Sequence, residues 1–457
     1  MISAESFWTH SLRASPSGES ITRILAAAIQ AVDPGETVRR SVHLEGDQLI
    51  VSGQPYDLHT FTQVAVLGIG KASIAMAEAL AEILGDRLSA ALVISKHAAE
   101  PSTLHHSSSF AHKPWSILQG GHPIPDERSL LAGEKVLEFV SALGPDDLLI
   151  SLISGGGSAL VTAPVNGVSL ADMQSFTALL LSSGATITEI NTLRRRLDRL
   201  KGGGLVKLTN NATVISLIIS DVVGNSLEAI ASGPTSPDPT TRQEALAAIQ
   251  KYGLCESISS SIMSVLENAP ETPKSDDLIF MKVQNVLIGK NQLAAQAALK
   301  QAHEEGFNPY LLRTDLQGEA RQVAFELATF LRQAKRSNSP VPAPACILAG
   351  GETTVTVKGQ GRGGRNTELA LAAVSELADF PGVMLVTLAT DGEDGVTDAA
   401  GAVVTGEAYR RAGGMGLNPG DFLDRNDSYS FFTALEDLLK SGPTGTNVND
   451  LVFLFTF

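Results

Sequence analysis

Apolar and polar positions alternate along the chain in blocks that predict strands followed by helices. In residues 61–84 an apolar run, FTQVAVLGIG, passes through a glycine turn into a stretch with apolar residues at helical spacing. Comparable blocks recur over residues 145–163, 213–234, 283–313, 345–379 and 382–404, and the final run VNDLVFLFTF predicts one more strand. Strands that alternate with helices indicate a parallel sheet covered by helices on both faces.

Two proline-rich stretches interrupt this alternation. Residues 232–241 read SGPTSPDPTT, and residues 267–277 read ENAPETPKSDD, a composition typical of connecting segments. A chain of 457 residues is too long for one ordinary hydrophobic core. We therefore predict an α/β protein of two domains, residues 1–237 and residues 238–457.

Charge and composition narrow the classes of partner. The formal net charge is −15, which gives no basic footprint for nucleic acid and would be repelled by an anionic membrane. No apolar run reaches the roughly 18 residues of a membrane span, and the N-terminus lacks a secretory signal. Cys255 and Cys346 have no metal-ligand spacing, as expected for a reduced, cytoplasmic protein. Any anionic ligand must be held by local groups that act against the overall field.

Three consecutive glycines stand out in SLISGGGSAL, residues 151–160. A glycine run at the start of a helix leaves backbone N–H groups bare, and phosphate oxygens can approach them without meeting a Cβ. One glycine would suffice for a plain turn, which is the alternative. The stretch is not a Walker loop. We predict that it binds phosphate through Ser154, Gly155, Gly156, Gly157 and Ser158.

Two further loops carry candidate ligand groups. VAVLGIGKAS places Lys71 in a glycine turn between a strand and a helix, but Ser73 stands where a dinucleotide fingerprint has its third glycine. The next strand ends in Lys96 instead of a ribose-binding acid, so phosphate or carboxylate suits this turn better than nicotinamide. GGHPIPDERS holds His122 in a rigid proline loop, where a catalytic and a structural role are about equally expected.

Basic residues cluster in NTLRRRLDRLKGGG, residues 191–204. Such a run is usually a solvated face. In so acidic a chain, one or two of these side chains facing a ligand is a fair alternative, and Arg194 with Lys201 is the better pair for that role.

Acidic residues mark three other strand ends. Asp221 follows an apolar strand directly, where it could hold Mg²⁺, act as a base or cap a turn. GGETTVTVKGQGRGGRNTELALAA combines Glu352 with Arg365 and Asn366 in a glycine-rich loop, and arginine offers a planar fork to phosphate or carboxylate. An acidic cluster begins at Asp391 in the stretch ATDGEDGVTDAAG. The stretch lacks the last ligand of a calcium-binding loop, so the remaining interpretations are Mg²⁺ coordination and a solvated turn.

Seven of these segments, in order from about residue 65 to about residue 405, resemble the glycerate 2-kinase family, whose C-terminal half is the MOFRL domain. They are GIGKAS, GGHPIPDERS, SGGGSAL, KGGGL, SDVVGNSLEAIASGPT, GGETTVTVKGQGRGGRNTELALA and LATDGEDGVTDAAGA. The resemblance implies two α/β domains with the active site in a cleft between them, and a Rossmann-like parallel sheet in the first. It also implies transfer of phosphate from ATP to D-glycerate, with Mg²⁺, to give 2-phosphoglycerate. Asn225 departs from an acid common in the family.

Residue roles follow from the resemblance and from the physical needs of phosphoryl transfer, which are positioning and charge neutralisation. The catalytic residues are then Lys71 and Arg365, the phosphate site is the SGGGS turn with Lys201, and the substrate residues are Ser73, His122, Arg194 and Asn366. The metal would be held by one or more of Asp221, Glu352 and Asp391. Two other functions stay open: a nicotinamide-dependent hydroxypyruvate reductase and a non-catalytic sugar-acid binding protein. Partners are small molecules, and a homodimer is one option.

Overall fold

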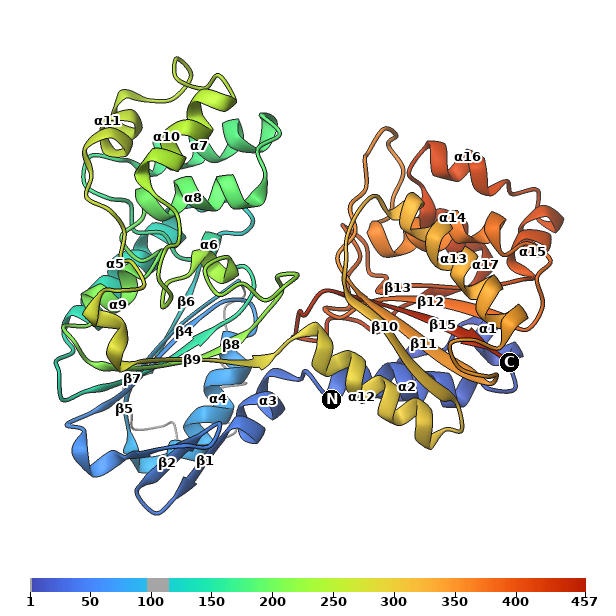
Figure 1. Cartoon of the computed structure of the whole chain (residues 1–457), viewed down its shortest axis with the longest axis horizontal. Helices are drawn as coiled ribbons and strands as arrows, with labels where there is room; N and C mark the ends of the chain where they lie inside the picture. Colours follow the sequence, from blue (N-terminus) through green and yellow to red (C-terminus); the bar gives the residue numbers. More distant parts are fainter. Residues whose placement is uncertain (1, 97–114) are drawn as a thin grey trace. The chain divides into compact units, whose positions relative to one another are not determined.

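The computed structural model describes residues 2–96 and 115–457, and the chain divides into two compact units (Figure 1). The inserted unit is Pro34–Ile288. The terminal unit combines Met1–Asp33 with Gly289–Phe457. The expected boundary at residues 237 and 238 is therefore wrong, and each unit is described by itself below.

The boundary differs because the chain after residue 238 stays with the inserted unit. Helices α10 (Arg242–Lys251) and α11 (Ser260–Asn268) share an apolar cluster with α7 (Leu170–Ser182) and α8 (Ile187–Leu197). Strand β9 (Val283–Gly289) then joins the edge of the same sheet. The two proline-rich stretches are thus loops inside one unit.

A six-stranded sheet forms the centre of the inserted unit. Its order is β6-β5-β4-β7-β8-β9, and the pairs from β6 to β8 are all parallel, as expected. The bounds are β4 (Val64–Ile69), β5 (Leu88–Ser95), β6 (Trp115–Gln119), β7 (Leu148–Ile153) and β8 (Thr213–Ile219). The chain runs outward from β4 to β6 and then returns to β7 on the other side of β4. The carboxyl ends of β4 and β7 are therefore the switch point of the sheet, which is where open α/β sheets bind ligands.

Helices and a small sheet complete the inserted unit. Apolar side chains of α5 (Glu127–Ser141), capped by Asp126 as expected, pack in one cluster with residues of β4 and β7. A three-stranded antiparallel sheet, which the sequence pattern did not reveal, precedes β4 and consists of β1 (Val42–Glu45), β2 (Gln48–Val51) and β3 (Gln54–Asp57). The remaining helices are α3 (Pro34–Ser41), α4 (Ser73–Leu84), α5 (Glu127–Ser141), α6 (Gly157–Leu160) and α9 (Gly204–Leu208).

The terminal unit is built on a mixed sheet in the order β10-β11-β15-β12-β13-β14. Only β10 and β11 pair in parallel; the other neighbours are antiparallel, which corrects the expectation of a parallel sheet in this half. The last strand of the chain is inserted between β11 and β12, so it reverses the direction at the centre. The bounds are β10 (Asn308–Leu316), β11 (Ala345–Gly351), β12 (Val383–Ala389), β13 (Gly401–Thr405), β14 (Leu438–Leu439) and β15 (Asp450–Thr456).

Helices from both ends of the chain cover this sheet. Helix α12 (Asn291–Glu304) contacts β10 and β11 and lies beside α2 (Gly18–Gln30), with Arg23 of α2 paired to Glu305 at 2.6 Å (Figure 1). Helices α13 (Ala320–Ser337) and α14 (Arg365–Glu376) pack together in a second apolar layer. The shorter helices are α1 (His10–Ala14), α15 (Ala408–Gly414), α16 (Pro419–Asp424) and α17 (Ser428–Leu435).

Single 3-10 turns account for the other helical residues that the structure describes. They are η1 (Ala4–Phe7), η2 (Leu58–Thr60), η3 (Gly85–Arg87), η4 (Ile230–Ser232) and η5 (Leu278–Lys282). None of the described helices combines the length and the apolar character needed to cross a bilayer.

Hydrogen bonds join the two turns at the switch point of the inserted unit. The N–H of Lys71 donates to the carbonyl of Gly155 at 3.0 Å, and the N–H of Ala72 donates to the hydroxyl of Ser154 at 3.0 Å. Gly70 allows this contact because its φ is +134° and a Cβ there would lie 2.2 Å from Oγ of Ser154.

We expect Gly70→Ala to lower the free energy of unfolding by at least about 2 kcal/mol, because it combines backbone strain with a steric clash. Gly46→Ala is the matched control in the same unit. Gly46 also has positive φ, +62°, but a Cβ there would meet nothing within 4 Å, so we expect a loss of only about 1 kcal/mol. Equal losses in urea unfolding would contradict the proposed packing of the two turns.

Candidate functional site

The three glycines of the SGGGS turn are each close to a different neighbour. A Cβ on Gly155 would lie 2.2 Å from Oδ2 of Asp221, and one on Gly157 would lie 2.9 Å from Cβ of Ala231. Gly156 has φ +84°, and a Cβ there would approach His122 at 3.1 Å and Lys71 at 3.3 Å. A side chain at any of the three positions would displace one of these groups. The run therefore lets five polypeptide segments meet at the ends of β4 and β7.

The helix that follows the turn is shorter than the sequence suggested. Helix α6 spans only Gly157–Leu160, with Gly156 at its N-cap. One turn gives little dipole, because the partial charge at a helix end grows from aligned peptide units. Ser154 is 2 % exposed and already accepts a hydrogen bond from Ala72. Ser158 shares a hydrogen bond with Ser232 at 2.9 Å.

A cavity of about 150 Å³ lies beside this turn. It is lined by His122, Pro123, Pro125, Gly156, Ser158, Ala159, Met173, Thr177, Arg194 and Lys201. Five of these residues belong to the predicted phosphate and substrate sites, although they come from three separate stretches of sequence. The structure thus brings together His122, Gly156, Ser158, Arg194 and Lys201.

The two cations that line the cavity differ in their partners. Lys201 is buried and paired with the buried carboxylate of Asp198, at 2.6 Å between Nζ and Oδ2. Arg194 is partly buried, and burial lowers its pKa. Among the residues that the structure describes, no carboxylate forms an ion pair with Arg194. A desolvated cation without a counter-charge is unfavourable, so this position favours the binding of an anion.

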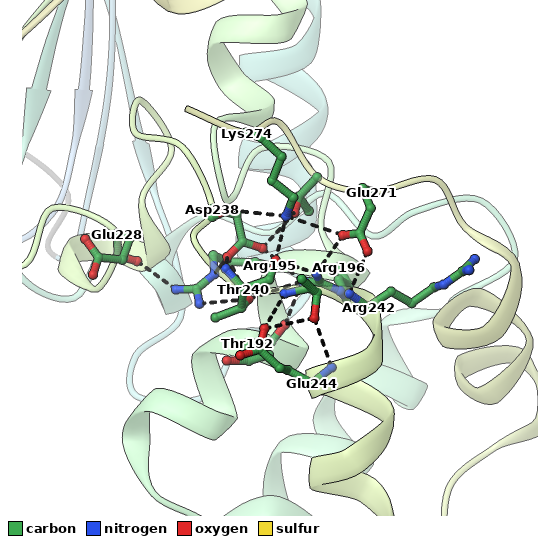
Figure 2. A network of polar contacts seen from close by, with 12 residues as sticks. Thr192, Arg195, Arg196, Glu228, Asp238, Thr240, Arg242, Glu244, Glu271 and Lys274 are labelled. Atoms are coloured by element: carbon green, nitrogen blue, oxygen red, sulfur yellow. Dashed lines mark hydrogen bonds and ion pairs between the residues drawn. The ribbon is translucent and has the colours of Figure 1, made fainter. Parts of the chain in front are cut away.

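The neighbouring arginines do not line the cavity and belong to a separate network of polar contacts, which Figure 2 shows. Arg195 and Arg196 are both paired with the fully buried carboxylate of Asp238, each at 2.9 Å. Arg196 also pairs with Glu271 at 2.9 Å and donates to the carbonyl of Thr240. The basic run is therefore mostly buried and ion-paired instead of being a solvated face.

Lys71 and His122 form the other polar side of this region. Lys71 is exposed, and no carboxylate in the described part of the chain lies within ion-pair distance of it. Burial lowers the pKa of His122 to about 4, and the positive charges of Lys71 and Lys96 act in the same direction. His122 is therefore neutral at physiological pH and can accept a hydrogen bond from a ligand hydroxyl.

Ser73, a predicted substrate residue, has a different environment. Its side chain is fully buried, and its hydroxyl lies within hydrogen-bond distance of the carbonyls of Gly70 and Ile94, at 2.7 and 2.9 Å. It holds the turn to the neighbouring strand. This placement gives no support to direct contact with substrate.

Asp221 is the acidic residue beside Gly155. Burial raises its pKa, and the charge of Lys71 opposes that effect. In the described chain, no three His, Cys, Asp or Glu residues gather into a ready-made metal site. A single carboxylate still fits Mg²⁺, which is usually held by one or two carboxylates together with substrate phosphates.

In the terminal unit, Arg365 is the first residue of helix α14, and its positive charge is already paired with two carboxylates. Its Nε and Nη2 donate to the two carboxylate oxygens of Asp450 at 2.5 and 3.1 Å, and Nη1 pairs with Glu352 at 2.8 Å. Burial alone would lower the pKa of Arg365, but Asp450 and Glu352 outweigh it and raise the pKa. The pair with Asp450 fixes the direction of the guanidinium and leaves other N–H groups for a ligand.

Asp394 organises the start of the same helix. Its Oδ1 accepts from the backbone N–H of Asn366 at 3.0 Å, and its Oδ2 accepts from the N–H and hydroxyl of Thr367 at 2.8 and 2.7 Å. Asn366 is buried, and its amide also donates to Asp394. The predicted substrate role of Asn366 therefore gains no support. Asp391 accepts from the N–H of Glu393 in the acidic loop.

A larger hollow of about 480 Å³ in the terminal unit is a weaker candidate. Two arginines line it, but Arg410 pairs with Asp379 at 2.6 Å and Arg411 with buried Asp437 at 2.7 Å. Its cations are neutralised, and none of the predicted site residues lines it. We therefore place the candidate site at the switch point.

Sequence reasoning missed the carboxylates that set these charges, Asp198, Asp238 and Asp450. Asp198 lies only three residues before Lys201, in the turn that follows α8, so their closeness in the sequence could have indicated the pair. Asp238 and Asp450 are 42 and 85 residues from Arg196 and Arg365, and no local pattern connects such distant partners.

Comparison with known proteins gives likenesses over nearly the whole chain. Family models match residues 20–267 (a domain of unknown function, DUF4147) and residues 345–450 (MOFRL family). A D-glycerate 2-kinase from Thermotoga maritima is 40% identical over 85% of this chain and 90% of its own. A protein from Agrobacterium vitis named "putative hydroxypyruvate reductase" is also 40% identical, over 84% and 85%. The crystal structure of a glycerate kinase from Thermotoga maritima matches with a TM-score of 0.83 and 37% identity, covering 95% of this chain and 98% of that one.

We expect NMR titration of His122, assigned with a His122→Gln variant, to give a pKa of about 4. Lys71→Met should raise this pKa toward the ordinary 6.5, because a nearby positive charge that disfavours the imidazolium is removed. Lys96→Met is the matched control and should raise it less. A wild-type pKa near 6.5 would show that the imidazole is neither buried nor close to Lys71.

Proposed function

The chain belongs to the family of glycerate kinases with a C-terminal MOFRL domain, and from this premise we propose that it transfers the terminal phosphoryl group of ATP to D-glycerate, giving 2-phosphoglycerate. The observation that carries the proposal is the uncompensated Arg194 in a small polar cavity beside the SGGGS turn. A small carboxylic acid with hydroxyl groups fits this set of side chains. We further propose a cytoplasmic location, supported by two free cysteines.

Arg194 would bind the carboxylate of glycerate in this scheme. The guanidinium offers parallel N–H donors to a carboxylate, and partial burial strengthens the interaction. Ser158 would donate to a substrate oxygen. Neutral His122 would accept a hydrogen bond from a substrate hydroxyl and orient it, since a group with a pKa of about 4 is a weak base at neutral pH.

Lys71 would neutralise the negative charge of the phosphoryl group during transfer. It is exposed, adjacent to Gly156 and not committed to a carboxylate in the described residues. Phosphoryl transfer depends on positioning and on charge neutralisation, so such an ammonium group acts mainly in the transition state. The bare backbone of Gly155 and Gly156 would allow nucleotide phosphates to approach closely.

Asp221 fits the requirements of a magnesium ligand on the inserted unit, because its carboxylate touches the backbone of the glycine turn. A Mg²⁺ held by Asp221 would supply positive charge that offsets the negative charge of the phosphates. In the terminal unit Glu352 is engaged by Arg365, and the proposal there is that Arg365 adds positive charge for a bound anion. Asp450 keeps the guanidinium of Arg365 in place.

The alternative activity, nicotinamide-dependent reduction of hydroxypyruvate, has less support. Lys96 follows the second strand at the position where an acidic residue would hold a nicotinamide ribose. One pair of assays separates the two functions. In the first assay, a kinase should release ADP from ATP only when D-glycerate is present. NMR of the product then shows which hydroxyl of glycerate carries the phosphate. Steady oxidation of NADH or NADPH by hydroxypyruvate, without ADP release, would overturn the proposal, and so would ligand binding without ATP turnover.

We expect Arg194→Ala to raise KM for glycerate by about 100-fold and to change KM for ATP little, because a buried charged hydrogen bond is lost. Arg194→Lys should recover part of the affinity, since the ammonium cannot bind both oxygens in the same geometry. Arg199→Ala, an exposed position in the same basic run, is the control and should behave like wild type. An unchanged KM for glycerate in folded Arg194→Ala would remove Arg194 from the carboxylate site.

We expect Lys71→Ala and Arg365→Ala each to lose at least about 100-fold in kcat/KM, the lower range for electrostatic stabilisation of a transition state. For Lys71 the loss should lie mainly in kcat. Arg365→Ala should also lower Tm, because Asp450 is left without its partner; Arg365→Lys should rescue both only partly.

Arg362→Ala is the control for the second site, since Arg362 is exposed in the same loop. Near-normal kcat/KM in either alanine variant, with circular dichroism unchanged, would exclude that residue from the reaction.

A further inference from the structure

We infer that Met173 and Thr177 of helix α7 form the end of the substrate pocket and limit the acceptor to a three-carbon hydroxy acid. This inference rests on the proposed function, because it assigns the acceptor to the cavity beside Gly156. It adds a specificity role for two residues that no motif of the sequence marks.

The two side chains lie on one face of α7, because residues four positions apart are neighbours on a helix surface. Both line the cavity and both are buried, with 3 % and 5 % of their surface exposed. Arg194 comes from the next helix, α8. The α7 side chains therefore bound the same space that the cation enters.

The lining is divided chemically. The groups that can bind charge or hydroxyls are His122, Ser158, Arg194 and Lys201, whereas Met173 offers only an apolar surface. A carboxylate held by Arg194 places the carbon chain of the acid inside the cavity. The remaining carbon atoms must then fit against α7.

The volume sets a limit on that chain. About 150 Å³ lies well below the ~300 Å³ at which drug-sized ligand pockets begin, so the cavity suits a small acid. Glycerate is of this size. We expect a fourth carbon with its hydroxyl to crowd Met173 or Thr177, which line the cavity.

The end of the pocket is held by packing. Met173 belongs to an apolar cluster that also contains Phe176, Leu180, Ile190 and Leu193. Ser169 and Asp172 form a capping box at the start of α7. A methionine side chain still adapts more readily than a branched one, so the selection against a longer acid should be moderate, about 10- to 100-fold.

Thr177 adds a polar contact to this end. Its hydroxyl lines the cavity and has no hydrogen-bond partner among the residues that the structure describes. The hydroxyl of Thr177 can therefore donate a hydrogen bond to, or accept one from, the hydroxyl of glycerate that is not phosphorylated.

The test compares kcat/KM for D-glycerate and for its four-carbon homologue, 2,3,4-trihydroxybutanoate, by ADP release. Wild type should favour glycerate by at least about 10-fold. Met173→Ala should reduce this preference at least about 10-fold by admitting the longer acid. Thr177→Val, which keeps the shape but removes the hydroxyl, should raise KM for glycerate several-fold and leave the length preference unchanged.

Leu180→Ala is the matched control, because Leu180 is buried in the same cluster on the same helix but does not line the cavity. It should cost similar stability without changing the preference. Met173→Val, a milder truncation, serves if Met173→Ala does not fold.

Three results would overturn the inference: an unchanged preference in a folded Met173 variant, an equal change in Leu180→Ala, or a wild type that uses both acids alike. A wild type that phosphorylates neither acid would instead refute the proposed function itself.

Discussion

The buried carboxylate of Asp238 is the interaction on which the candidate site depends. It pairs with Arg195 and Arg196 and accepts hydrogen bonds from Thr240 and Thr272. Burial raises the pKa of Asp238, but the charge of Arg195 and the hydrogen bonds from Thr272 and Thr240 outweigh burial, so the pKa is lowered and the carboxylate stays charged. Two of three consecutive arginines are thereby fixed. The third, Arg194, remains on the cavity side of α8. Loss of the Asp238 carboxylate would leave the buried Arg195 without an ion-pair partner and Arg196 with Glu271 alone.

An acidic protein that binds anions must control where its positive charges are neutralised. Lys201 is matched by Asp198, and Arg365 by Asp450 and Glu352. Arg194 and Lys71 have no such partner in the described chain, and both approach the same glycine turn. A net charge of −15 therefore coexists with a local positive region. The carboxylates also hold the paired cations in fixed directions, which lowers the entropy lost when a ligand binds.

Local patterns in the sequence were enough to predict the strand, glycine turn and helix after Val64, the turn at Gly155 and the cap at Asp126, because each is set by neighbouring residues. Strand direction in the terminal unit was not predictable, because an apolar run such as β15 does not reveal whether the strand pairs parallel or antiparallel with its neighbours. The unit boundary depends on pairing of distant segments. Likewise, Ser73 lies in a turn whose sequence is typical of a ligand-binding site. Only the structure shows that its hydroxyl is buried and hydrogen-bonded to backbone carbonyls.

The discontinuous terminal unit has a consequence for the order of synthesis on the ribosome. The inserted unit is contiguous and has all its own residues once Ile288 has emerged. Helix α2 is made first, yet α12, on which it packs, is made only after Gly289. At roughly 5–20 residues per second, the 260 residues between the end of α2 and the start of α12 take about 13 to 52 s to synthesise. Until then Ile21, Leu25 and Ile29 remain exposed on the nascent chain, where they are open to capture by chaperones or to aggregation.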